Sequence, residues 1–140
     1  MGSKPANPRV YKLFMSHTWN HGNAFFELYT LLGRNKSFHH LSTLSPRTLS
    51  IMRYGSSEIR HEHITRKMKN CDIVLVMCGL YSAYGETMRE EMEVCKELGK
   101  PMIAIERYNE KLTSPLVKES ADRVVPWNSR RIIRAIKELT

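Results

Sequence analysis

The 140-residue sequence has no apolar stretch that approaches the roughly 18–20 residues needed to cross a membrane. Its longest apolar run, Ile73 to Cys78, has the length of a β-strand. The N-terminus does not show a charged segment followed by an apolar block, which is the pattern of a secretory signal peptide. From these absences we expect a cytoplasmic protein that has no membrane partner.

Cysteine is scarce, and the three cysteines do not show a CxxC spacing. Cys71, Cys78 and Cys95 each lie in or beside an apolar segment. An odd number of cysteines in a chain without a signal peptide indicates reduced thiols rather than a disulfide framework. We therefore expect all three to be small residues of the core.

The motifs of several enzyme classes are also absent. The sequence contains neither a GxGxxG nor a Walker pattern, so kinase, GTPase and Rossmann dehydrogenase functions lack support. His61 and His63 are two positions apart in a predicted helix, where they do not face each other. We therefore expect no metal site.

Acidic residues are outnumbered by basic ones, and the formal net charge is +8. Such an excess attracts anions. A nucleotide with phosphates, a nucleic acid, or simply a solvated basic surface would each account for it. The basic residues are scattered and do not form a run interleaved with aromatics, the pattern that holds single strands. A nucleic-acid partner is therefore the alternative with the least support.

What the sequence does contain is a regular alternation of strand and helix patterns. We interpret residues 1–10, which include Pro5 and Pro8, as a flexible tail and residues 11–140 as a single domain. Residues 42–57, which are rich in serine and threonine and contain Pro46, are predicted to be a long loop, either irregular throughout or with a short helical turn, and residues 79–85 a turn. The predicted strands are 11–16, 38–41, 72–78, 102–105 and 124–125, and the predicted helices are 20–33, 58–70, 86–98 and a last one capped by Ser129.

Strict alternation of this kind predicts an α/β fold in which helices cover both faces of a parallel sheet. With right-handed crossovers, the five strands form a flavodoxin-like, doubly wound three-layer sandwich with a five-stranded parallel sheet. Ligands of such sheets bind outside the carboxyl ends of the strands, where the strand order reverses. The predicted loops at that edge are residues 16–20, 42 onward, 79–85 and 106–109.

One carboxylate is out of place in the helix predicted for residues 86–98. At about 100° per residue, the apolar side chains of this helix fall within one arc of roughly 160°. Glu91 lies inside that arc, whereas the other glutamates of the helix lie opposite. A carboxylate directed toward a core is costly unless it is paired or reaches a polar cavity. Glu91 therefore either pairs with a nearby cation or backbone donor, or points into the cleft and serves chemistry there.

Polar and aromatic residues follow the first and third predicted strands, next to the same cleft. They would bind phosphate or ribose through hydroxyls and backbone amides, and an aromatic ring would stack on a base. The alternative is that they are ordinary loop residues, with Trp19 packed on a helix. The candidate substrate-binding residues are Ser16, His17, Trp19, Asn20, Tyr81 and Ser82.

Several segments, in this order and spacing, resemble bacterial TIR-like domains. They are Tyr11–His17, Asp72–Val76, Tyr81–Tyr84, Glu91 and Leu98–Pro101. The resemblance runs from about residue 11 to residue 105, and it is greatest to the ThsB group, the TIR-like component of Thoeris anti-phage systems. TIR enzymes usually carry their catalytic glutamate in a Trp-Cys-x-x-Glu pattern, which aligns here with residues 87–91. The glutamate matches Glu91, and the tryptophan and cysteine positions depart from the pattern.

The resemblance implies a TIR-like fold and an enzyme that cleaves the nicotinamide–ribose bond of NAD, with NAD as substrate, no metal, and Glu91 as the catalytic residue. It also implies that the product is a cyclic or conjugated ADP-ribose signal. This nucleotide would diffuse to a separate effector protein in anti-phage defence. TIR domains also form homo-oligomers and act as non-catalytic interaction modules, and the altered Trp-Cys positions keep that alternative open.

Overall fold

Five parallel strands form one sheet in the order β2-β1-β3-β4-β5. The computed structural model describes residues 9–16, 19, 23–43, 46–78, 81–106 and 115–140. The strands are β1 (Val10–Met15), β2 (His39–Ser42), β3 (Ile73–Met77), β4 (Met102–Glu106) and β5 (Arg123–Pro126). The helices are α1 (Ala24–Gly33), α2 (Pro46–Tyr54), α3 (Ser57–Lys69), α4 (Tyr81–Leu98), α5 (Pro115–Ser120) and α6 (Ser129–Leu139).

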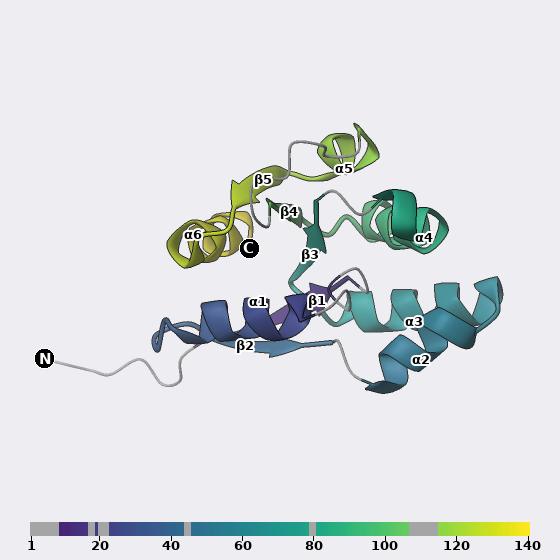
Figure 1. Ribbon diagram of the computed structural model, residues 1–140, viewed down its shortest axis with the longest axis horizontal. Helices are drawn as coiled ribbons and strands as arrows, with labels where there is room; N and C mark the ends of the chain where they lie inside the picture. The colour runs from purple at the N-terminus through teal and green to yellow at the C-terminus, as the bar shows by residue number, and fades with distance from the viewer. Residues whose placement is uncertain (1–8, 17–18, 20–22, 44–45, 79–80, 107–114) are drawn as a thin grey trace, which may run out of the picture.

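The helices cover both faces of the sheet, which makes a three-layer flavodoxin-like sandwich, as the alternation predicts (Figure 1). Helices α1 and α6 pack on one face, and their apolar side chains form one core with those of the strands. Helices α3, α4 and α5 pack on the other face and form a second core, to which Met52 of α2 contributes. Every residue of β3 is buried, as expected for a central strand covered on both sides. Within the described residues, no helix is both long and apolar enough to span a bilayer.

Two predicted irregular segments are partly helical. The predicted loop 42–57 contains α2, which begins at Pro46, because proline is well suited to the first turn of a helix. Helix α4 begins at Tyr81, five residues earlier than predicted, and therefore includes Gly85. A glycine inside a helix costs only about 1 kcal/mol, which the packing of a long helix offsets.

Other boundaries shift by a few residues. Helix α1 begins at Ala24, and α6 is capped by Asn128, whose side chain accepts a hydrogen bond from the backbone of Arg131, rather than by Ser129. Strand β1 begins at Val10, inside the predicted tail; residues 1–8 of that tail lie outside the described residues. The apolar spacing in α3 suggests that Ile59, Ile64 and Met68 all face inward. Ile64 and Met68 are buried, whereas Ile59 in the first turn is 54% exposed.

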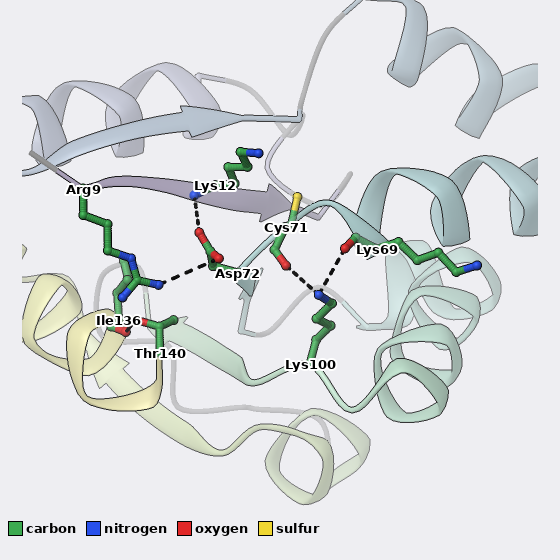
Figure 2. A network of polar contacts seen from close by, with 8 residues as sticks. All are labelled: Arg9, Lys12, Lys69, Cys71, Asp72, Lys100, Ile136 and Thr140. Atoms are coloured by element: carbon green, nitrogen blue, oxygen red, sulfur yellow. Dashed lines mark hydrogen bonds and ion pairs between the residues drawn. The ribbon is translucent and has the colours of Figure 1, made fainter. Parts of the chain in front are cut away.

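Polar side chains join the strands at the amino-terminal edge of the sheet (Figure 2). The carboxylate of Asp72, just before β3, accepts a hydrogen bond from the backbone nitrogen of Lys12 in β1 at 2.8 Å. The Lys100 ammonium donates to the backbone oxygens of Lys69 and Cys71 at 3.2 and 2.8 Å. Lys100 thus ties the chain entering β4 to the end of α3, on the edge opposite to the predicted cleft.

We expect Lys100→Met to lower the free energy of unfolding by about 1–2 kcal/mol, because it removes two hydrogen bonds from a cation and keeps most of the apolar stem. Urea unfolding would measure the change. Lys96→Met, at an exposed position of α4, is the matched control and should leave stability nearly unchanged. Equal unfolding midpoints for the two variants would show that the Lys100 contacts contribute nothing.

The corner between α2 and α3 requires glycine at position 55. A Cβ atom there would lie 2.6 Å from the backbone oxygen of Ile51 and 3.3 Å from the Ile59 side chain. We expect Gly55→Ala to destabilise the protein by about 1–3 kcal/mol in thermal or urea unfolding, because the backbone must shift to admit the methyl group. Gly33→Ala is the control, since a Cβ at Gly33 meets nothing within 4 Å and alanine favours the helix. A Gly55 variant as stable as the Gly33 variant would contradict this.

Candidate functional site

Helix α4 directs Glu91 into the protein, as its periodicity predicts. Glu91 is 1% exposed, and it lies among the buried residues Met88, Met92 and Cys95 of the same helix. Glu93 is exposed, in agreement with the predicted solvent face. The helix therefore turns the Glu91 carboxylate toward the core and the Glu93 carboxylate toward solvent.

The Glu91 carboxylate meets the hydroxyl of Ser16, 75 residues away in the sequence. Ser16 immediately follows β1, and its Oγ donates a hydrogen bond to Glu91 Oε1 at 2.7 Å. Ser16 has no exposed surface. A hydroxyl bonded to a carboxylate at this distance makes a short, strong hydrogen bond. The pair therefore holds one carboxylate oxygen at a defined place beside the carboxyl end of β1.

Backbone contacts fix the end of β1 that carries Ser16. The Ser16 nitrogen donates to the backbone oxygen of Leu75 in β3 at 3.0 Å. The indole nitrogen of Trp19 donates to the same oxygen at 3.0 Å. On the other side, the hydroxyl oxygen of Thr43 accepts a hydrogen bond from the nitrogen of Met15 at 3.2 Å. Ser16 is thus held between β3 and the residue that follows β2.

This location is the point where the strand order reverses. The chain passes from β1 to its neighbour β2 and then crosses to β3 on the other side of β1. The two chain crossovers lie on opposite faces of the sheet and diverge at this point. In sheets of this kind, ligands bind here, outside the carboxyl ends of β1 and β3. The Ser16–Glu91 pair is at this edge.

Trp19 lies in the core. Its side chain is fully buried, and its ring centre is 6.3 Å from that of Trp127. The ring belongs to the core that faces α1 and α6, as in the packing alternative. Its contribution to the site is the hydrogen bond to Leu75, which helps to fix the backbone next to Ser16.

The other four predicted binding residues have no described side chains. His17 and Asn20 lie outside the described residues. Tyr81 and Ser82 are the first two residues of α4, and the structure describes their backbone only. Among the predicted site residues, the structure therefore brings together Ser16 and Glu91, with Trp19 beside Ser16.

An ion pair next to Glu91 was not predicted from the sequence. Arg60 of α3 donates two hydrogen bonds to the carboxylate of Glu90, at 2.8 and 3.3 Å, and a third to the backbone oxygen of Gly55 at 2.9 Å. The side chains of Arg60 and Glu90 are only 14% and 15% exposed. This bidentate pair fixes the rotation of α4 one residue before Glu91. The helical wheel placed Glu90 in solvent, because it includes no neighbouring helix.

Two surface hollows of about 910 Å³ each lie among the described residues, and neither Ser16 nor Glu91 lines them. One lies between α3 and α4, where Thr65, Arg66 and Glu97 contribute to its walls. The other lies near the carboxyl end of α4 and includes Lys100. Within the described part of the chain, no group of three or more histidine, cysteine or acidic side chains is placed to hold a metal ion.

All three cysteines are buried and free, which confirms their prediction as core residues. Burial raises the pKa of the Cys71 thiol to about 11. Burial, assisted by the negative charges of Asp122 and Glu91, raises the pKa of the Cys95 thiol to about 12. Both thiols therefore remain protonated near neutral pH, and neither has the thiolate character of a catalytic nucleophile.

The chemistry available at the site is that of one fixed, water-poor carboxylate. In a low-dielectric environment, such a group stabilises a neighbouring positive charge far more than it would in water. No protein-family model matches this chain, and no curated protein matches its sequence.

Proposed function

We propose that this protein is a TIR-like enzyme that cleaves the nicotinamide–ribose bond of NAD, and that Glu91 is its catalytic residue. The observation that carries the proposal is the Ser16–Glu91 hydrogen bond, which places a buried carboxylate where the strand order reverses. The resemblance to TIR-like domains points to the same residue independently of the structure. The net charge of +8 favours approach of the negatively charged pyrophosphate of NAD.

The reaction suits a single carboxylate. The nicotinamide ring of NAD is already cationic, so it leaves as a neutral molecule with the electron pair of the broken C–N bond and needs no general acid. As this bond breaks, the ribose carbon gains oxocarbenium character, as in glycoside cleavage. The Glu91 carboxylate stabilises that positive charge and orients the ribose through its hydroxyls.

An acceptor then attacks the ribose carbon with an electron pair, and an acceptor that carries a proton on the attacking atom releases it to solvent. An acceptor atom within the same molecule yields a cyclic ADP-ribose, and a second small molecule yields a conjugate. Either product is a diffusible nucleotide that would activate an effector protein, the role that Thoeris-like proteins have in anti-phage defence.

The direct test is incubation of the purified protein with NAD, with nicotinamide and ADP-ribosyl products measured by mass spectrometry. We expect nicotinamide together with a cyclic or conjugated product. Extracts of phage-infected cells, added in parallel, would supply a missing trigger. Absence of nicotinamide under both conditions would contradict the proposal.

An exposed apolar surface favours a second candidate, a non-catalytic interaction module. Phe26 on α1 is 70% exposed, and Leu41 on the edge strand β2 is also exposed. Tyr29 and His40 make a ring contact at 5.4 Å that joins α1 to β2. If this candidate is correct, light scattering should show self-association, and Glu91→Ala should keep full biological activity.

A further inference from the structure

A chain of hydrogen bonds, buried at its centre and part-buried at its ends, connects the outer helices α2 and α3 to the end of β1. His63 of α3 is buried, and its Nε2 lies 3.2 Å from the hydroxyl of Thr48 in α2. The Thr48 hydroxyl donates to the backbone oxygen of Thr43 at 3.2 Å. On the outer side, an Arg66 guanidinium nitrogen lies 3.3 Å from His63 Nδ1. The chain therefore runs Arg66–His63–Thr48–Thr43.

The chemistry of the partners decides which atom donates and which accepts in each of these hydrogen bonds. A guanidinium can only donate, so His63 Nδ1 must accept and the ring hydrogen must be on Nε2. His63 Nε2 then donates to the Thr48 hydroxyl, which is left with its own hydrogen for the Thr43 oxygen. Each donor thus meets an acceptor when His63 is neutral in this one tautomer.

Thr43 carries the chain to the candidate site. Its nitrogen donates to the oxygen of Leu13, and its hydroxyl oxygen accepts from the nitrogen of Met15. Met15 is the last residue of β1 and is bonded covalently to Ser16, whose hydroxyl holds Glu91. A displacement of Thr43 therefore moves the backbone that carries Ser16.

We propose that Thr48 and His63 are positioning residues for Glu91. They act through Thr43 and Ser16, so that the packing of α2 against α3 sets the geometry of the carboxylate. This inference rests on the proposed function of NAD cleavage. Since a misplacement of about 1 Å at a reacting centre can cost a large factor in rate, the expected effect is on kcat more than on KM.

Thr48→Val and Thr48→Ser form a matched pair, because valine keeps the shape and loses the hydroxyl, whereas serine keeps the hydroxyl. We expect Thr48→Val to lower kcat for nicotinamide release about tenfold with little change in KM. Thr48→Ser should stay within about threefold of the wild type. His63→Leu and His63→Gln form a second pair, for which we expect the same contrast in kcat. Leucine has no donor or acceptor, whereas the glutamine amide has both.

Two further readouts separate positioning from a general loss of stability. Hydrogen exchange at the Met15 amide should accelerate in Thr48→Val but not in Thr48→Ser, while the Val74 amide, bonded to Pro101 at the far edge of the sheet, should not change. Combining Thr48→Val with Ser16→Ala should cost no more kcat than Ser16→Ala alone, because both act through one contact.

The proposal is overturned if Met15 exchange is the same in both Thr48 variants, or if the losses in kcat from Ser16→Ala and Thr48→Val multiply. It is also overturned if Thr48→Ser is as slow as Thr48→Val. Failure of the proposed function has a different signature. The wild type would then release no nicotinamide, or Glu91→Gln would release it as fast as the wild type, whatever the exchange rate at Met15.

Discussion

Glu91→Gln is expected to lower the rate of nicotinamide release from NAD by at least about 100-fold. The amide has nearly the same shape as the carboxylate, and its oxygen still accepts the hydrogen bond from Ser16. What it lacks is the negative charge that stabilises the oxocarbenium-like sugar. We expect kcat at saturating NAD to carry the loss, because this charge acts mainly in the transition state.

The matched control is Glu93→Gln, two residues further along α4. Glu93 is exposed, so this variant removes the same charge from the same helix without altering the site. It should keep nearly full activity, and both variants should unfold at similar temperatures. Equal rates for Glu91→Gln and Glu93→Gln would remove Glu91 from the mechanism.

Ser16→Ala is expected to lower kcat by about 10–100-fold, the equivalent of losing a hydrogen bond to a charged group. The variant keeps the charge of Glu91 but removes the donor that holds Oε1 at 2.7 Å. Because both side chains are buried, we also expect a loss of about 1–3 kcal/mol in the free energy of unfolding. Stopped assays with NAD and urea unfolding would measure the two effects.

A double-mutant cycle tests whether the contact itself is responsible. If Ser16 acts through Glu91, the losses in kcat of Ser16→Ala and Glu91→Gln, expressed as activation free energies, should not add when the two are combined. Ser50→Ala, at an exposed position of α2, is the control and should change neither activity nor stability. Strict additivity of the two losses would mean that the serine and the glutamate contribute independently.

The sequence predicted the two members of the site but assigned different roles to them. Helical periodicity placed Glu91 inward, and the position of Ser16 after a strand placed it at the cleft as a substrate-binding residue. In the structure, the Ser16 hydroxyl is bonded to Glu91. No local pattern reveals such a contact, because it joins side chains of two elements 75 residues apart.

The supporting contacts were not predicted, for similar reasons. Pro46 and the serine-rich composition indicated a loop where α2 forms, and without that helix Thr48 had no predicted position. Helical spacing correctly separated His61 from His63, but it did not show that His63 is buried against α2. The wheel of α4 also did not indicate that Glu90 pairs with Arg60.

The sequence by itself determined the order of the five strands, the parallel sheet and the inward direction of Glu91. These follow from periodicity and from the handedness of crossovers, which depend on neighbours close along the chain. Only the tertiary structure decided which side chain meets Glu91 and which residues hold the end of β1. Those contacts depend on the distances between packed elements, and packing brings together Ser16 and Glu91, Arg60 and Glu90, and Thr48 and His63.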